Sequence, residues 1–174
     1  ADIPGKSPEE EQMINIGAVL RVSPIKDVKT MIQAFAFAKK RVPKLKLWIM
    51  GPTDEDEKYA QECFDIVDSL GVSDIEFTGR VTVKEYLGRR DFTILTSISE
   101  GQPLTILESY AAHKPTIATD VGNCRELIYG NDDGFGAAGI LTHIMNLEEI
   151  AQAMIDLAID PEGREQMGEA GYKR

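Results

Sequence analysis

The chain has 174 residues, enough for one domain with a well-developed buried core. Its hydrophobic content of 43% and charged content of 28% are ordinary for a soluble globular protein. The net charge of −10 argues against non-specific binding to nucleic acid or to anionic membranes, because their phosphate groups would be repelled. A local basic pocket remains compatible with this charge.

The two cysteines, Cys63 and Cys124, are far apart in sequence and are not spaced as a metal-ligand cluster. We expect them to be buried or idle thiols rather than a disulfide. No apolar run approaches the length of about 18 residues that a membrane span needs, and no basic segment of a signal peptide is present. We therefore expect a cytoplasmic protein. Association with a membrane complex is compatible with the sequence but not visible in it.

Residues 1–12 are polar and contain two prolines, so we expect them to be a linker or the trimmed edge of a domain. Over residues 13–174 short apolar runs alternate with stretches of helical periodicity. In chain order we expect a strand at 13–20, a helix at 27–42, a strand at 44–51, a helix at 54–71, a strand at 74–79, a helix at 83–90, a strand at 92–97, a helix at 103–113, a strand at 115–120, a helix at 124–130, a strand at 138–142, and helices at 147–160 and 162–171.

This alternation predicts right-handed crossovers between strands, and hence an α/β fold with a Rossmann-like parallel sheet and helices on both faces. Ligands of such sheets bind beyond the carboxyl ends of the strands. The residues expected at that edge are Arg21, Lys26, Gly51, Gly79, Arg80, 97–101 and 120–123.

The helix expected at 103–113 follows a strand that ends close to an acid, Glu100. Pro103 suits the first helical position, where its missing N–H costs nothing. Apolar residues at helical spacing predict an inward face, with Glu108 at its margin; they are Leu104, Leu107 and Ala111. The free amides and dipole of the first turn would form an anion site on the side of Glu100. The pattern indicates a phosphorylated ligand that bears hydroxyl groups.

Arg21 and Lys26 lie in the loop after the first expected strand. Two cations at the carboxyl edge can converge on a diphosphate and stabilise the charge on a leaving group. The alternative is a pair of solvated loop charges. Because Glu100 and Glu108 are expected at the same edge, we favour the diphosphate site.

Several motifs occur in an order typical of one enzyme family. They are Arg21 with Lys26, WIMGP at 48–52, IEFTGRV at 75–81, EGQPLTILE at 100–108 and AAHKPTIATDVGNCRELI at 111–128. From about Met13 to its end the chain resembles the donor domain of a retaining glycosyltransferase, family 4 of the GT-B fold class. The segment TSISEGQPLTILESYAAHKP is most similar to the Pel-type exopolysaccharide glycosyltransferases.

The resemblance implies an enzyme that transfers a hexosyl unit from a nucleoside diphosphate sugar, with UDP favoured, to a saccharide acceptor in polysaccharide synthesis. The chain would be its C-terminal, nucleotide-sugar-binding half. The acceptor domain would precede this half, so the isolated domain is expected to bind donor without transferring it. No metal or other cofactor is expected, because cations of the protein would cover the leaving group.

The resemblance also implies roles for single residues. Glu100 would lie near the hexose hydroxyls, with Arg21 and Lys26 on the departing diphosphate, and Glu108 would bind the ribose. Backbone amides would face the diphosphate, namely those of Gly101, Gln102, Leu104 and Thr105. Arg80 and Val81 match the segment whose backbone reads the base.

Two positions depart from the family pattern. His113 stands where a glycine is usual, and we interpret it as an exposed cap at a helix end. Asn123 replaces the second glycine of a GG-x-x-E-x-I segment. Arg125 and Glu126 follow it. They either have the role of the matching positions in the family or form an ion pair within the domain.

Other features have plainer interpretations than a site. The acids at 54–56 resemble a metal-binding DxD motif, but helix capping explains them better. His143 is expected at the surface or packed, and Trp48 and Phe35 in the core. Residues 89–90, two arginines, are expected to be a solvated helix end.

Two further classes of function stay open. A non-catalytic subunit of a polysaccharide synthesis complex would keep the affinity for the nucleotide but transfer no sugar. A nucleotide-sugar epimerase would need acid–base groups at the sugar carbon, and the expected cluster offers only Glu100.

Overall fold

The computed structural model of the chain describes residues 6–174. Six parallel strands form one sheet in the order β3-β2-β1-β4-β5-β6. The strands are β1 (Ile14–Val19), β2 (Leu45–Met50), β3 (Ile75–Gly79), β4 (Phe92–Leu95), β5 (Thr116–Thr119) and β6 (Gly139–Thr142). The helices are α1 (Pro8–Glu11), α2 (Val28–Arg41), α3 (Glu57–Leu70), α4 (Val83–Leu87), α5 (Leu104–Ala111), α6 (Cys124–Tyr129), α7 (Leu147–Ala158) and α8 (Pro161–Lys173), with a 3-10 turn η1 (Pro24–Lys26).

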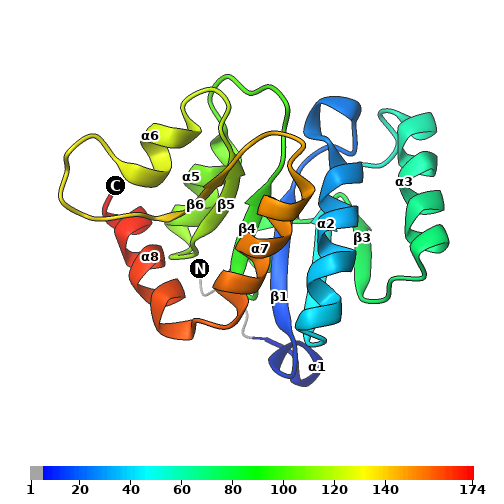
Figure 1. The fold of residues 1–174 in the computed structure, drawn as a ribbon, viewed down its shortest axis with the longest axis horizontal. Coiled ribbons are helices and arrows are strands. Elements are labelled where there is room, and N and C mark those ends of the chain that lie inside the picture. Colours follow the sequence, from blue (N-terminus) through cyan, green and yellow to red (C-terminus); the bar gives the residue numbers. More distant parts are fainter. Residues whose placement is uncertain (1–5) are drawn as a thin grey trace.

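Helices cover both faces of the sheet, which confirms the expected Rossmann-like α/β fold (Figure 1). Successive residues of a strand point to opposite faces, and here they enter different buried clusters. Ile94 and Ile117 pack with α2, α3 and α7, whereas Leu95 and Ala118 pack with α5, α6 and α8. Phe35 lies in the first of these clusters, as expected.

The strand order reverses between β1 and β4. The chain builds the sheet outward from β1 to β3, returns to pair β4 with β1, and then continues outward to β6. The loops that leave the carboxyl ends of β1 and β4 therefore run in opposite directions. Open sheets of this type bind ligands in the crevice beside such a reversal. These loops contain Lys26 and Glu100, respectively.

Capping residues set the ends of α3, as expected for the acids at 54–56. The Asp56 carboxylate accepts a hydrogen bond from the Tyr59 amide at 3.1 Å, and Gly71 closes the helix in the left-handed conformation. Both cysteines are buried and neither forms a disulfide. Burial raises the pKa of each thiol to about 11, so both are neutral at physiological pH.

The inward face expected for the helix at 103–113 is wrong. Helix α5 begins one residue later, with Pro103 as its N-cap, and Leu104 and Leu107 are 62% and 39% exposed. The face that packs inward instead carries Ile106 and Tyr110, which are 1% and 3% exposed and belong to the buried cluster with α6 and α8. On the same face the Thr93 hydroxyl of β4 donates to the buried Ser109 hydroxyl at 2.7 Å. Tyr110 donates to a backbone carbonyl of α6 at 2.7 Å. An outward apolar stripe is therefore compatible with a well-packed helix.

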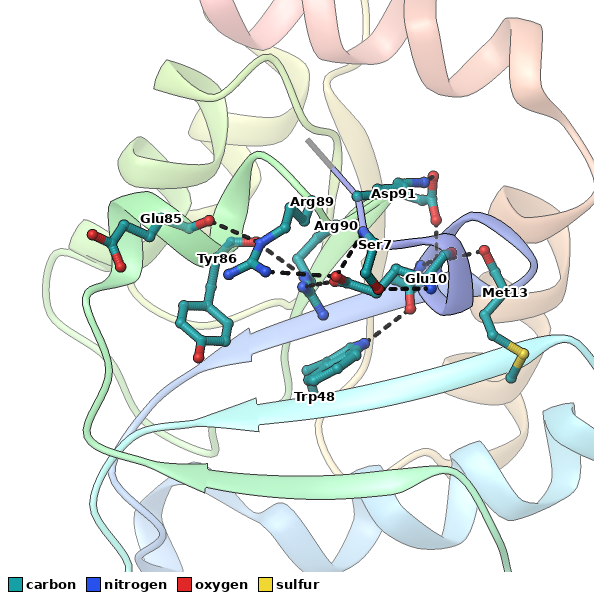
Figure 2. Close-up of polar contacts among 11 residues, drawn as sticks. Ser7, Glu10, Met13, Trp48, Glu85, Tyr86, Arg89, Arg90 and Asp91 are labelled. Carbon is teal, nitrogen blue, oxygen red and sulfur yellow. Dashed lines mark hydrogen bonds and ion pairs between the residues drawn. The ribbon is translucent and has the colours of Figure 1, made fainter. Parts of the chain in front are cut away.

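The solvated helix end expected at residues 89–90 is also wrong for its second arginine. Arg90 is 0% exposed, and its Nη2 lies 2.5 Å from Oε2 of Glu10 in α1 (Figure 2). Its guanidinium lies over the Trp48 ring, 4.1 Å from the ring centre. Its stem passes over Gly17, where a Cβ would come within 2.7 Å of the arginine Cγ. Trp48 is half-buried beneath this cation.

The sequence predicts a linker or the trimmed edge of a domain at residues 1–12. Within the described part of this segment, α1 (Pro8–Glu11) packs against β1. Lys6 pairs with Asp91 at 2.5 Å, and Asp91 also accepts a hydrogen bond from the Asn15 amide at 2.7 Å. Residues 1–5 lie outside the described residues.

Candidate functional site

A cavity of about 330 Å³ lies at the carboxyl edge of the sheet, on the side of β1, β2 and β3. Its walls come from the ends of these strands, from the loops that follow them and from the start of α5. Five of the residues that the sequence places in the site line it: Arg21, Lys26, Arg80, Val81 and Thr105. Leu20, Met50 and Val83 add apolar surface. The site therefore combines cations with an apolar wall.

Glu100 joins this site through an ion pair. Lys26 Nζ lies against Glu100 Oε1, and the Ser97 hydroxyl donates to the same oxygen at 2.9 Å. The two charged side chains are only 17% and 12% exposed, so Lys26 is not a solvated loop charge. Arg21, in contrast, is exposed. The sequence placed these groups on one edge, and the structure pairs two of them directly.

Arg80 lies at the rim of the cavity. Its Nη1 donates to both carboxylate oxygens of Asp54, at 2.9 and 3.1 Å, with both side chains mostly exposed. These hydrogen bonds lower the pKa of Asp54. The two aspartates of residues 54–56 thus differ in role, because Asp54 orients a rim arginine whereas Asp56 caps α3.

Glu108 lies outside the cavity, although the sequence assigned it to the same ligand. It is exposed on α5 and lines a separate depression of about 220 Å³, together with Lys84 and Leu87. Val83 borders both hollows, so they are neighbours. Gly101, Gln102 and Leu104 are exposed and do not line the cavity either; their roles remain predictions.

Two residues that shape the site had no role in the sequence argument. Ser97 is fully buried and holds Glu100. Gly122, in the loop after β5, has φ of 52°, and a Cβ there would lie 2.5 Å from the carbonyl oxygens of both Glu100 and Gly101. The sequence indicated only that both residues lie in segments expected at the carboxyl edge of the sheet, 97–101 and 120–123.

We expect Gly122→Ala to weaken about fivefold the binding of the nucleotide that the resemblance implies, because the added Cβ must push the backbone at residues 100–101 out of place, at a cost of about 1 kcal/mol. Gly134→Ala is the matched control. Gly134 also has a positive φ, 76°, but a Cβ there would meet nothing within 4 Å. Calorimetric titration and thermal melting should show that Gly134→Ala loses only the stability due to its positive φ, whereas Gly122→Ala loses more stability and also loses affinity. Equal affinities would contradict the close approach as the cause.

The remaining candidates from the sequence have partners within the domain. His113 has φ of 61° at the end of α5, is exposed and pairs with Glu169 at 2.7 Å, as expected of a helix cap. His143 is exposed and pairs with Glu149 at 2.9 Å. Arg125 pairs with Asp120 at 2.7 Å, which supports an ion pair within the domain.

Among residues 6–174, no group of three or more histidines, cysteines or acids is arranged to hold a metal ion. No helix in this range has the length and apolar character to cross a membrane.

Comparison with known proteins relates this chain to glycosyltransferases. The model of the family described as Glycosyl transferases group 1 matches residues 1–174. The putative glycosyltransferase EpsD of Bacillus subtilis is 30% identical over 150 residues, which cover 85% of this chain and 37% of EpsD. The N-acetyl-alpha-D-glucosaminyl L-malate synthase of Bacillus anthracis is 31% identical over 167 residues, 95% of this chain and 40% of that enzyme. The chain thus spans well under half the length of these relatives.

Solved structures share the fold. HepE of Anabaena in complex with UDP-glucose superposes with a TM-score of 0.82 at 21% identity, over 97% of this chain and 48% of HepE. The C-terminal domain of a group 1 glycosyl transferase family protein (LpcC) from Francisella tularensis has a TM-score of 0.79 at 26% identity, over 98% of this chain and 85% of that one.

Proposed function

Because the chain belongs to the group 1 glycosyl transferases, we propose that it is the donor-binding domain of a retaining hexosyltransferase. The donor would be a nucleoside diphosphate sugar, with UDP as the nucleotide, and the acceptor a saccharide in polysaccharide synthesis. The observation that carries this proposal is the cavity at the carboxyl edge, where Arg21 and Lys26 face the start of α5. Solved structures of similar fold, HepE and GtfA, contain UDP.

The cations suit a diphosphate leaving group. Arg21 and Lys26 can donate charge-assisted hydrogen bonds to its oxygens and offset the charge that develops as the glycosidic bond breaks. The first amides of α5 have no acceptor within the helix, and the helix dipole adds partial positive charge at this end. Thr105 of this first turn lines the cavity. These groups provide the electrostatic stabilisation that a metal ion supplies in other enzymes.

The two glutamates would recognise the neutral parts of the donor. Glu100 is held beside the cavity and would accept hydrogen bonds from hexose hydroxyls. Glu108 would bind the ribose, which requires the nucleoside to extend past Val83 into the neighbouring depression. Arg80 and Val81, which also line the cavity, would contact the base. The acceptor would bind to the rest of the enzyme, so this chain is expected to bind donor and transfer nothing.

Isothermal titration of the chain with UDP, ADP, GDP and CDP tests the proposal. We expect UDP to bind most tightly, with the same affinity in the presence of EDTA as with magnesium or manganese, because protein cations line the cavity. Strict dependence on a divalent cation would contradict the metal-free site. Absence of binding by all four nucleotides would refute the proposed function.

A further inference from the structure

Three consecutive residues directly after β4 hold Lys26 and Glu100. Thr96, Ser97 and Ile98 each make a different contact, and we call them the frame. The Thr96 hydroxyl donates to the backbone carbonyls of Lys26 and Asp27, at 3.2 and 3.1 Å. The Ile98 amide donates to the carbonyl of Ile25 at 3.0 Å. These contacts tie the η1 turn, and with it Lys26, to the end of β4.

Ser97, the central residue of the frame, acts on the other partner of the ion pair. Its hydroxyl donates to Glu100 Oε1 at 2.9 Å, and its carbonyl accepts a hydrogen bond from the Thr119 hydroxyl of β5 at 2.6 Å. Ser97 and Thr119 are both 0% exposed. A buried hydroxyl with a fixed backbone holds a carboxylate in one orientation far better than a solvated one does.

The two oxygens of Glu100 are used unequally. Oε1 accepts hydrogen bonds from the Ser97 hydroxyl and the Lys26 ammonium. Oε2 makes no hydrogen bond with any residue of the described range 6–174. An ionised carboxylate has about four acceptor positions, so Oε2 remains available to ligand hydroxyls. Lys26 likewise keeps two of its three N–H donors for phosphate oxygens.

We infer that Ser97 is a positioning residue for the donor sugar: it fixes Oε1 of Glu100 so that Oε2 is presented to a hexose hydroxyl. Ser97 therefore determines how strongly the site prefers a nucleotide sugar over the free nucleotide, and it contributes little to nucleotide binding. This inference rests on the proposed function, because it assumes that the cavity binds a nucleoside diphosphate sugar.

The inference predicts different effects on the affinity for UDP and on the added affinity due to the sugar. A simple packing role of Ser97 would change both together. Loss of the Ser97 hydroxyl frees the carboxylate to turn toward Lys26, which misplaces the acceptor of the sugar hydroxyl. Thr96 and Ile98 still hold the η1 backbone that carries Lys26, so the ammonium still reaches the diphosphate. The affinity for UDP should therefore persist while the added affinity due to the sugar is lost.

Titration of UDP, UDP-glucose and UDP-N-acetylglucosamine against the wild type and Ser97→Ala tests this. We expect the variant to bind UDP within about twofold of the wild type and to lose about fivefold of the preference for the better UDP-sugar over UDP. Ser99→Ala is the matched control, because Ser99 is exposed in the same loop and makes no side-chain hydrogen bond among residues 6–174; it should behave as wild type.

Variants at Thr119 give a second, independent test. Thr119→Val removes the hydrogen bond to the Ser97 carbonyl with little change in shape, and should lower the sugar preference in the same direction as Ser97→Ala. Thr119→Ser keeps the hydroxyl and should retain the wild-type preference.

The possible failures are distinguishable. Equal weakening of UDP and UDP-sugar in Ser97→Ala would show a role in folding alone and would overturn the inference. An unchanged preference in Ser97→Ala, or a wild type that binds UDP but prefers neither UDP-sugar, would overturn it as well. A wild type that binds no UDP would instead refute the proposed function.

Discussion

Replacing Arg90 with methionine is expected to lower the free energy of unfolding by about 3–5 kcal/mol, because Glu10 would be left as a buried carboxylate without its main partner. Arg90 is 0% exposed at its side chain and Glu10 is 7% exposed, so water cannot replace the lost ion pair. Urea denaturation, followed by circular dichroism, measures the change.

Two controls separate the ion pair from ordinary packing. Arg89→Met should cost much less, because Arg89 lies 3.6 Å from Glu10 and keeps more solvent contact. The double variant Glu10→Met/Arg90→Met should be more stable than Arg90→Met alone, because it leaves no unpaired buried charge. A loss below 1 kcal/mol for Arg90→Met, or simple additivity in the double variant, would contradict the role assigned to this pair.

The contribution of the Glu10–Arg90 pair to stability should decrease in acid. Burial raises the pKa of Glu10, but hydrogen bonds from Ser7 and the nearby charges of Arg90 and Arg89 outweigh it and hold that pKa below its usual range. A carboxyl with a lowered pKa stabilises the fold above its usual pKa, and this contribution is lost as the pH falls through the lowered value. Wild type should therefore lose stability in acid more steeply than the double variant does.

Replacing Lys26 with methionine is expected to weaken UDP binding by about ten- to a hundredfold, because charge-assisted contacts to phosphate contribute about 1.5–3 kcal/mol. Lys26 lines the cavity and keeps N–H donors beyond the one that Glu100 occupies. Titration calorimetry with UDP measures the loss. Because Glu100 is mostly buried and would lose its cation, a moderate fall in melting temperature should accompany the loss of affinity.

Lys29→Met is the matched control for this substitution. Lys29 is one helical turn further along the chain, pairs with Glu62 at 3.5 Å and does not line the cavity. Its loss should leave UDP affinity unchanged. If Lys26→Met lowered the melting temperature sharply while the affinity per folded molecule stayed at the wild-type value, Lys26 would be structural and its assignment to the diphosphate wrong.

Local patterns were enough to predict the order of strands and helices, and therefore the parallel sheet. Strand alternation and capping signals such as Asp56 and Gly71 act over a few residues, so they are readable in the sequence. The carboxyl edge follows from that order, because every parallel strand ends on the same side. Lys26 and Glu100 could thus be placed near one another before any contact was known.

The contacts themselves depend on residues far apart in the chain. Glu10 and Arg90 are 80 positions apart, and an arginine after a short helix is normally solvated, so its burial over Trp48 has no local signal. The helix α5 has two apolar sets at helical spacing, and the sequence does not distinguish them: Ile106 and Tyr110 pack inward, whereas Leu104 and Leu107 are exposed. Periodicity indicates that a helix has an apolar face, but contacts with distant elements, such as the Thr93–Ser109 hydrogen bond, accompany only one of the two faces.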